Sequence, residues 1–168
     1  ENTVKIGGET VLFRHEKTFV NKPGFAILIS DAMPEAEVNA RLNRFKGLKY
    51  ERVGLVLRPE MIAVKNESGD PGKFEALVQK VKADTNAALI LMSEKTEALA
   101  AGVKACADRV PLIYAVTGGN SEALANLCDM AGAADADLLF ATPVFVPHPR
   151  IAEAARQMGF AHAIVAIG

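Results

Sequence analysis

The densest run of side chains that could do chemistry is residues 65–70, with the sequence Lys-Asn-Glu-Ser-Gly-Asp. The lysine offers a cation, the asparagine and serine offer hydrogen bonds, and the glycine lets backbone approach a ligand closely. The run follows an apolar segment and precedes a helix expected to begin near Pro71, so a helix end that favours anions lies behind it. A structural interpretation stays open, in which Asp70 caps that helix and Pro71 takes its first position.

Other candidate groups are weaker. Residues 14–17 (Arg-His-Glu-Lys) could transfer protons, although neighbours on a strand point to opposite faces, so a solvated turn is the alternative. Residues 117–121 (Thr-Gly-Gly-Asn-Ser) could hold a phosphate through backbone N–H groups, but they lack the P-loop ending and the third glycine of a dinucleotide site. His148 and His162 have no partner at metal-ligand spacing, so no metal site is predicted.

Composition narrows the class of protein. The chain has 168 residues, a net charge of -1 and a pI near 6.4, which gives no electrostatic case for a nucleic-acid or anionic-membrane partner. No apolar run approaches the roughly 20 residues that span a bilayer, and the first residues do not resemble a secretory signal. We therefore expect a cytoplasmic protein.

The two cysteines support the same compartment. Cys106 and Cys128 fall inside expected helices among alanines and leucines, which is typical of buried, reduced thiols. An iron–sulfur cluster needs about four thiolates, so the cysteines of this chain do not support one.

A strand-then-helix unit recurs about every 25 residues, a pattern that predicts an α/β fold with a parallel sheet. The expected strands are residues 25–31, 61–65, 88–92, 111–116, 137–141 and 162–167. The expected helices are residues 34–45, 71–82, 95–107, 121–131 and 149–158. Residues 52–57 are also strand-like but are split from the next strand by a proline, and residues 4–14 predict an N-terminal β-hairpin with a glycine turn.

The rhythm is continuous, so residues 1–168 are expected to form a single domain. About six parallel strands fit an open doubly wound sheet, and they also fit six of the eight strands of a TIM-like β/α barrel. The sequence stops directly after an apolar strand, which would leave an exposed hydrophobic edge. Both folds stay open on this pattern. We expect from the ending that the sequence is cut from a longer protein, so a barrel here would be incomplete, with about six of its eight strands.

In parallel sheets the carboxyl ends of the strands carry the chemistry. Small polar or acidic residues follow several expected strands and are predicted to line a common mouth. These candidate binding residues are Asp31, Asn66, Ser68, Ser93 and Thr117.

Five stretches of the chain resemble the large (gamma) subunit of the corrinoid iron–sulfur protein family: residues 6–19, 50–54, 62–69, 89–94 and 111–115. The resemblance implies a β/α barrel lying between a four-iron-cluster domain and a cobalamin-binding domain. It implies that the whole protein carries a methyl group on cobalt, accepted from a methyltetrahydrofolate or tetrahydropterin methyltransferase and delivered to acetyl-CoA synthase. It also implies pairing with the barrel of the small subunit. Neither the cluster cysteines nor a cobalamin domain is recognisable in these 168 residues.

The resemblance favours a carrier that binds a corrinoid (cobalamin) near the five strand-end residues and is not a catalyst by itself. Two alternatives stay open. A stand-alone, pterin-binding, methyltransferase-like enzyme would use Asp31 and Asn66 on the heterocycle and Lys65 on negative charge. A flavodoxin-like domain for a small phosphate-containing molecule would use residues 117–121.

Overall fold

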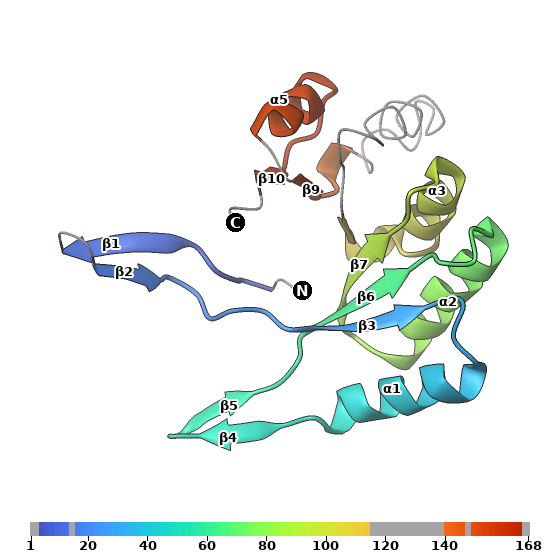
Figure 1. The fold of residues 1–168 in the computed structure, drawn as a ribbon, viewed down its shortest axis with the longest axis horizontal. Coiled ribbons are helices and arrows are strands. Elements are labelled where there is room, and N and C mark those ends of the chain that lie inside the picture. Colours follow the sequence, from blue (N-terminus) through green and yellow to red (C-terminus); the bar gives the residue numbers. More distant parts are fainter. Residues whose placement is uncertain (1–3, 14–15, 115–139, 147–148, 166–168) are drawn as a thin grey trace.

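The computed structural model describes residues 4–13, 16–114, 140–146 and 149–165, and it has an α/β fold built on one parallel sheet (Figure 1). The sheet strands are β3 (Ala26–Ser30), β6 (Met61–Lys65), β7 (Ala88–Met92), β8 (Leu112–Ile113), β9 (Val144–Val146) and β10 (Ala163–Val165). They pair side by side in chain order, from β3 to β10, and every pairing is parallel. The predicted parallel sheet is therefore confirmed.

The helices between the strands are α1 (Glu35–Gly47), α2 (Pro71–Asp84), α3 (Thr96–Ala105) and α5 (Pro149–Gln157), with a short 3-10 helix at Ala107–Arg109. Helix α2 begins where expected because the Asp70 carboxylate accepts hydrogen bonds from the backbone N–H groups of Gly72 and Lys73. Its apolar side is buried through Phe74, Leu77, Val78 and Val81.

Helices cover one face of the sheet, and the other face is partly open. Strand order follows chain order without reversal, and right-handed crossovers then place the helices on one face. Figure 1 shows α1, α2 and α3 along the outer side of β3, β6 and β7. The side chains beneath the helices are almost fully buried: Ile29, Ile62, Val64, Leu89, Leu91 and Ile113.

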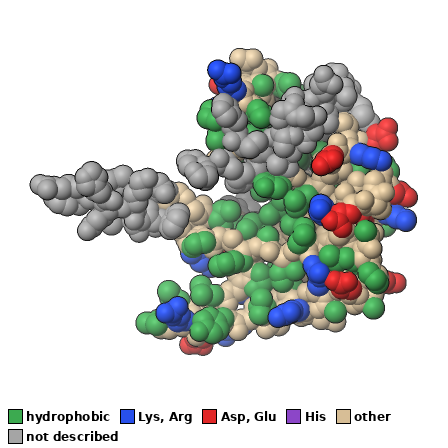
Figure 2. Space-filling view, viewed as in Figure 1, with side chains coloured by type: hydrophobic (Ala, Val, Ile, Leu, Met, Phe, Trp, Pro, Cys, Tyr) green, Lys and Arg blue, Asp and Glu red, His purple; other side chains and the backbone are tan. Residues whose placement is uncertain are grey.

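The other face is also apolar, but it is partly open. The paired row Leu28, Ala63, Ile90 and Leu112 crosses it, and the side chain of Leu28 is 40% exposed. Figure 2 shows hydrophobic side chains gathered over these strands. A parallel sheet that is apolar on both faces is built to be covered on both.

The N-terminal hairpin lies further along the chain than the predicted residues 4–14. Its strands are β1 (Glu9–Phe13) and β2 (Glu16–Phe19), which are antiparallel. Gly7 and Gly8 do not form its turn; their carbonyls instead accept hydrogen bonds from the backbone N–H groups of Asn21 and Val20 and extend the ribbon. The glycines have positive φ values of 61° and 81°, a backbone conformation that glycine adopts readily.

Residues 52–57 are not the single strand that their composition predicts. They belong to a second hairpin, β4 (Tyr50–Arg52) and β5 (Leu55–Leu57), joined by Val53 and Gly54. Both turn residues have positive φ, 50° and 75°, as a two-residue type I′ turn requires. Gly54 favours the turn, but the apolar residues around it make the sequence resemble a single strand.

The strand expected at residues 137–141 is wrong over the part that the structure describes. Phe140 and Ala141 end a helical segment, and the strand is β9, three residues later. A short continuous apolar run does not distinguish a strand from a helix, and the two described residues of this run are helical. The helix expected at residues 121–131 and the ends of the strands expected at 111–116 and 162–167 lie outside the described residues. In the part of the chain that the structure describes, none of the helices is both long enough and apolar enough to cross a bilayer.

Candidate functional site

Four of the five predicted binding residues, Asp31, Asn66, Ser68 and Ser93, lie together at the carboxyl ends of β3, β6 and β7. The sheet register explains the meeting. Ser30, Lys65 and Met92 are paired across these strands, so the residues that follow them leave the sheet side by side. The fifth residue, Thr117, lies outside the described part of the chain.

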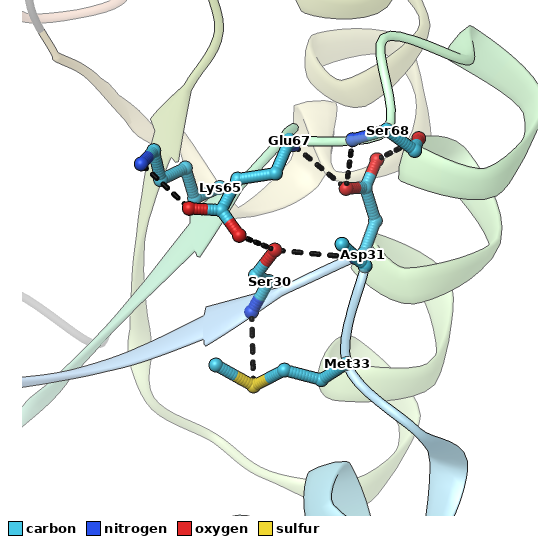
Figure 3. Close-up of polar contacts among 7 residues, drawn as sticks. Ser30, Asp31, Met33, Lys65, Glu67 and Ser68 are labelled. Atoms are coloured by element: carbon cyan, nitrogen blue, oxygen red, sulfur yellow. Dashed lines mark hydrogen bonds and ion pairs between the residues drawn. The ribbon is translucent and has the colours of Figure 1, made fainter.

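Asp31 is the centre of this strand-end cluster (Figure 3). One carboxylate oxygen, Oδ1, accepts hydrogen bonds from the backbone N–H groups of Glu67 and Ser68, at 2.7 and 2.9 Å. The other, Oδ2, accepts from Asn66 Nδ2 at 2.6 Å and from the Ser68 hydroxyl at 2.7 Å. A carboxylate offers about four acceptor positions, so the hydrogen-bonding capacity of Asp31 is filled by this loop.

Asn66 and Ser93 extend the cluster to the third strand. The Ser93 hydroxyl donates to Asn66 Oδ1 at 3.0 Å, while the backbone N–H of Lys95 donates to the same hydroxyl. The Lys95 ammonium donates to the carbonyl of Gly69, which closes the loop from its other side. Gly69 has a φ of 70°, and a Cβ there would lie 2.8 Å from Lys95 Nζ. The positive φ favours glycine here, and a side chain at this position would also push the Lys95 ammonium away from the Gly69 carbonyl.

Two further residues, Ser30 and Glu67, take part in the cluster but are not among the five predicted binding residues. The buried Ser30 hydroxyl donates to Glu67 Oε2 at 2.6 Å, and Lys65 Nζ donates to Glu67 Oε1 at 2.7 Å (Figure 3). The ends of two paired strands are thus joined twice, through Asp31 and through Glu67. The sequence signal was available, since Ser30 is the last residue of its strand and Glu67 lies in the polar run.

Both carboxylates are held in the ionised form. Partial burial raises the pKa of Asp31, but hydrogen bonds from Ser68, Asn66 and Glu67 outweigh it and hold the pKa below its ordinary value. Hydrogen bonds from Lys65 and Ser30 likewise lower the pKa of Glu67. The cluster is therefore a pre-formed, anion-centred support for the loop of residues 66–70, rather than a pair of groups poised to exchange a proton.

Two of the remaining candidates, His162 and Cys106, are described by the structure and lie outside the cluster. His162 precedes β10 and so lies at the amino end of that strand. Cys106 is fully buried and its Sγ donates to the carbonyl of Gly102, and burial raises the pKa of this thiol to about 12. Its prediction as a buried thiol is confirmed. Cys128, His148 and residues 117–121 fall outside the described ranges, as do the first two residues of the 14–17 run. Within the described residues, no three histidine, cysteine or acidic side chains converge as metal ligands.

A family model and several known proteins match most of this chain. A family model for the CO dehydrogenase/acetyl-CoA synthase delta subunit (CdhD) matches residues 1–142. The corrinoid/iron-sulfur protein large subunit of Moorella thermoacetica is 39% identical over 124 residues, which are 74% of this chain and 28% of that protein. The acetyl-CoA decarbonylase/synthase complex subunit gamma of Archaeoglobus fulgidus is 42% identical over 120 residues, 71% of this chain and 25% of that protein. The matched region thus spans about a quarter of the length of these relatives.

Proposed function

Because this chain belongs to the CO dehydrogenase/acetyl-CoA synthase delta subunit family, we propose that it is the barrel portion of a corrinoid methyl-carrier protein. In this role it helps to position a corrinoid (cobalamin) for methyl transfer between a methyltetrahydrofolate or tetrahydropterin methyltransferase and acetyl-CoA synthase. Its partners would be those two enzymes and the barrel of the corrinoid protein's small subunit. The names of its relatives, a corrinoid/iron-sulfur protein large subunit and complex gamma subunits, support this role.

The barrel is part of the proposal. A doubly wound sheet reverses its strand order at a switch point, whereas β3 to β10 follow one another in chain order. Helices cover one face of the sheet, and the other face leaves Leu28 and Ile164 about 40% exposed. Two more strands between β10 and β3 would close this layer into a barrel interior.

The strand-end cluster is the observation that carries the proposed role. Asp31, Asn66, Ser68 and Ser93 fix a polar loop at the end of the sheet where ligands meet this fold. The side chains of Asn66 and Ser68 hold the loop of residues 66–70 in one geometry, and the surface of this loop is what a corrinoid would meet. Among the described residues at these strand ends there is no histidine to ligate cobalt. A cobalt ligand would therefore come from elsewhere, and the bound corrinoid would supply the methyl-accepting centre.

The saturation of Asp31 favours the carrier over a pterin-binding enzyme. A pterin ring would need acceptors from Asp31 and Asn66, but Asp31 already receives four hydrogen bonds and the Asn66 amide is used on both sides. Lys65, the cation offered to negative charge, is paired with Glu67 at 2.7 Å. These side chains position the loop, and the loop is what a large cofactor would meet.

A spectroscopic titration tests the proposal. The purified chain is mixed with cobalamin and then with methyltetrahydrofolate, and the visible spectrum is followed. A cobalamin shift without methyl transfer is expected, and Asp31→Asn should weaken it, while the matched carboxylate-to-amide change Glu35→Gln, on an 80% exposed side chain, should not. Methyl transfer by the chain alone would instead establish the pterin enzyme. No response to either compound would contradict both roles.

A further inference from the structure

The β4–β5 hairpin exposes more apolar surface than its size warrants. It projects from the body of the protein beyond α1 (Figure 1). The exposed fractions are 94% for Val53, 67% for Leu55 and 60% for Tyr50. Figure 2 shows hydrophobic and basic side chains side by side at this end of the molecule. A cluster of exposed apolar residues beside charged ones is typical of a protein interaction site.

The turn of this hairpin places an apolar, conformationally strained residue in solvent. Val53 is a β-branched residue at a φ of 50°, a region that such residues rarely adopt, and asparagine or aspartate before glycine is the stable solution for this turn. An apolar residue in a strained conformation at a fully exposed tip is costly in two independent ways. Both costs are offset if the tip is buried against another surface.

Unpaired cations flank the hairpin. An open cavity of about 820 Å³ lies against it and is lined by residues that include Lys5, Lys49, Val56 and Arg58. Two other lysines of this cavity are paired, Lys22 with Glu60 and Lys46 with Asp84. Within the part of the chain that the structure describes, no ion pair involves Lys5, Lys49 or Arg58. The charge beside the apolar ridge is therefore predominantly positive.

We propose that the β4–β5 hairpin is a docking ridge that enters a groove of a partner protein with an apolar floor and an acidic rim. Val53, Leu55 and Tyr50 would fill the groove, and Lys49 and Arg58 would meet the acidic rim. Charge complementarity selects this occupant, since a neutral or basic groove would leave the cations opposed or unpaired. The cavity reaches Glu60 and Ala88, at the amino ends of β6 and β7, so this surface and the strand-end cluster lie at opposite ends of the sheet.

Site-specific photocrosslinking in the full-length protein tests the ridge. Val53 is replaced by p-benzoylphenylalanine in cells of the native host, and crosslinked peptides are identified by mass spectrometry. The control carries the same probe at Gln79, an exposed position on α2. The expected result is at least a tenfold higher yield at position 53, to an apolar residue with aspartate or glutamate around it in another protein. Crosslinks to a second copy of this chain, to another segment of the same chain or to a surface without acidic residues would overturn the proposal, as would a yield equal to the control.

Two variants separate docking from folding. In the position-53 probe background, Lys49→Gln with Arg58→Gln should lower the crosslink yield about tenfold, and added salt should do the same. With the probe moved to position 55, Val53→Asn should also lower the yield although it relieves the turn, so the variant should bind less while melting no earlier. Undiminished crosslinking by both variants would show that neither the charge nor the tip makes the contact. The ridge is distant from the corrinoid-facing loop, so the cobalamin shift should be the same in all these variants.

Discussion

At the carboxyl ends of β3, β6 and β7, Asp31 accepts four hydrogen bonds and Lys65 is paired with Glu67. At the amino ends of the same sheet, Lys49 and Arg58 have no ion pair within the described chain, and Val53 is 94% exposed at a strained turn. The first region satisfies its polar groups internally, and the second leaves them open. The contrast separates a support that holds one geometry from a surface that is completed by contact.

The two turns show the same difference. The loop that leads into α2 uses residues that suit it, since Gly69 takes the positive φ, Asp70 caps the helix and Pro71 begins it. The β4–β5 turn places glycine second but a β-branched valine first. Local sequence and local structure therefore agree at the strand-end cluster and conflict at the docking ridge, and such conflicts are expected at sites selected for binding.

Removal of the central carboxylate should have the largest effect. Asp31→Ala deletes four hydrogen bonds and leaves two backbone N–H groups without their acceptor, so the free energy of unfolding should fall by about 3 kcal/mol. Urea unfolding followed by circular dichroism measures it. The control Glu35→Ala, which removes an exposed carboxylate paired with Lys80, should lower the free energy of unfolding far less than Asp31→Ala does. Equal losses in the two variants would remove the distinction between the regions.

The Asp31 carboxylate should also make the free energy of unfolding depend on pH in acid. Hydrogen bonding outweighs burial and lowers the pKa of Asp31 in the folded protein, so its contribution is complete above the unfolded pKa of about 3.9 and is lost as pH falls through the lower, folded value. The difference in unfolding free energy between the wild type and Asp31→Ala should therefore shrink as pH falls below 4. Glu35, Glu67 and Asp108 also have lowered pKa values, which is why the difference, and not the profile alone, is diagnostic. A difference that stays constant down to pH 2 would contradict the assignment.

Sequence patterns predict the support well because its determinants are local. Residues 61–65 and 88–92 are apolar runs bounded by polar residues, and the structure has these strands with the same bounds. The meeting of Asp31, Asn66 and Ser93 follows from one general property, that parallel strands end at a common edge. The role of Glu67 was harder to predict, because its bond to Ser30 depends on β3 pairing directly with β6.

The docking ridge could not be predicted in the same way. A hairpin turn is recognised by Asn-Gly or Asp-Gly, and Val53-Gly54 lies inside an apolar stretch that looks like one strand. The strand expected at 137–141 failed for a related reason, since apolar residues such as Phe140 and Ala141 suit a helix as well as a strand. In both places the local sequence allows more than one structure.

Relief of the strained turn should have an intermediate effect of opposite sign. Val53→Asn places a residue that tolerates positive φ before Gly54, and it should raise the free energy of unfolding by about 1 kcal/mol. Thermal melting of the two proteins measures the change. The matched control Val56→Asn, on β5 with its neighbours in extended conformation, should gain nothing and lose β propensity. A lower melting temperature for Val53→Asn would show that the valine stabilises the free hairpin, and the ridge would then need no partner to explain it.

The smallest effect is expected at the exposed rim of the strand-end cluster. Lys65 and Glu67 are each 41% exposed, so Lys65→Gln should change the free energy of unfolding by less than about 0.5 kcal/mol. Glu67→Ala should lower the free energy of unfolding more than Lys65→Gln does, because the buried Ser30 hydroxyl loses the acceptor that lies 2.6 Å away. Urea unfolding of the two variants side by side ranks the partners. If Lys65→Gln proved the more damaging, the ion pair rather than the serine bond would join the ends of β3 and β6, and the support would depend on salt in the way expected of the docking ridge.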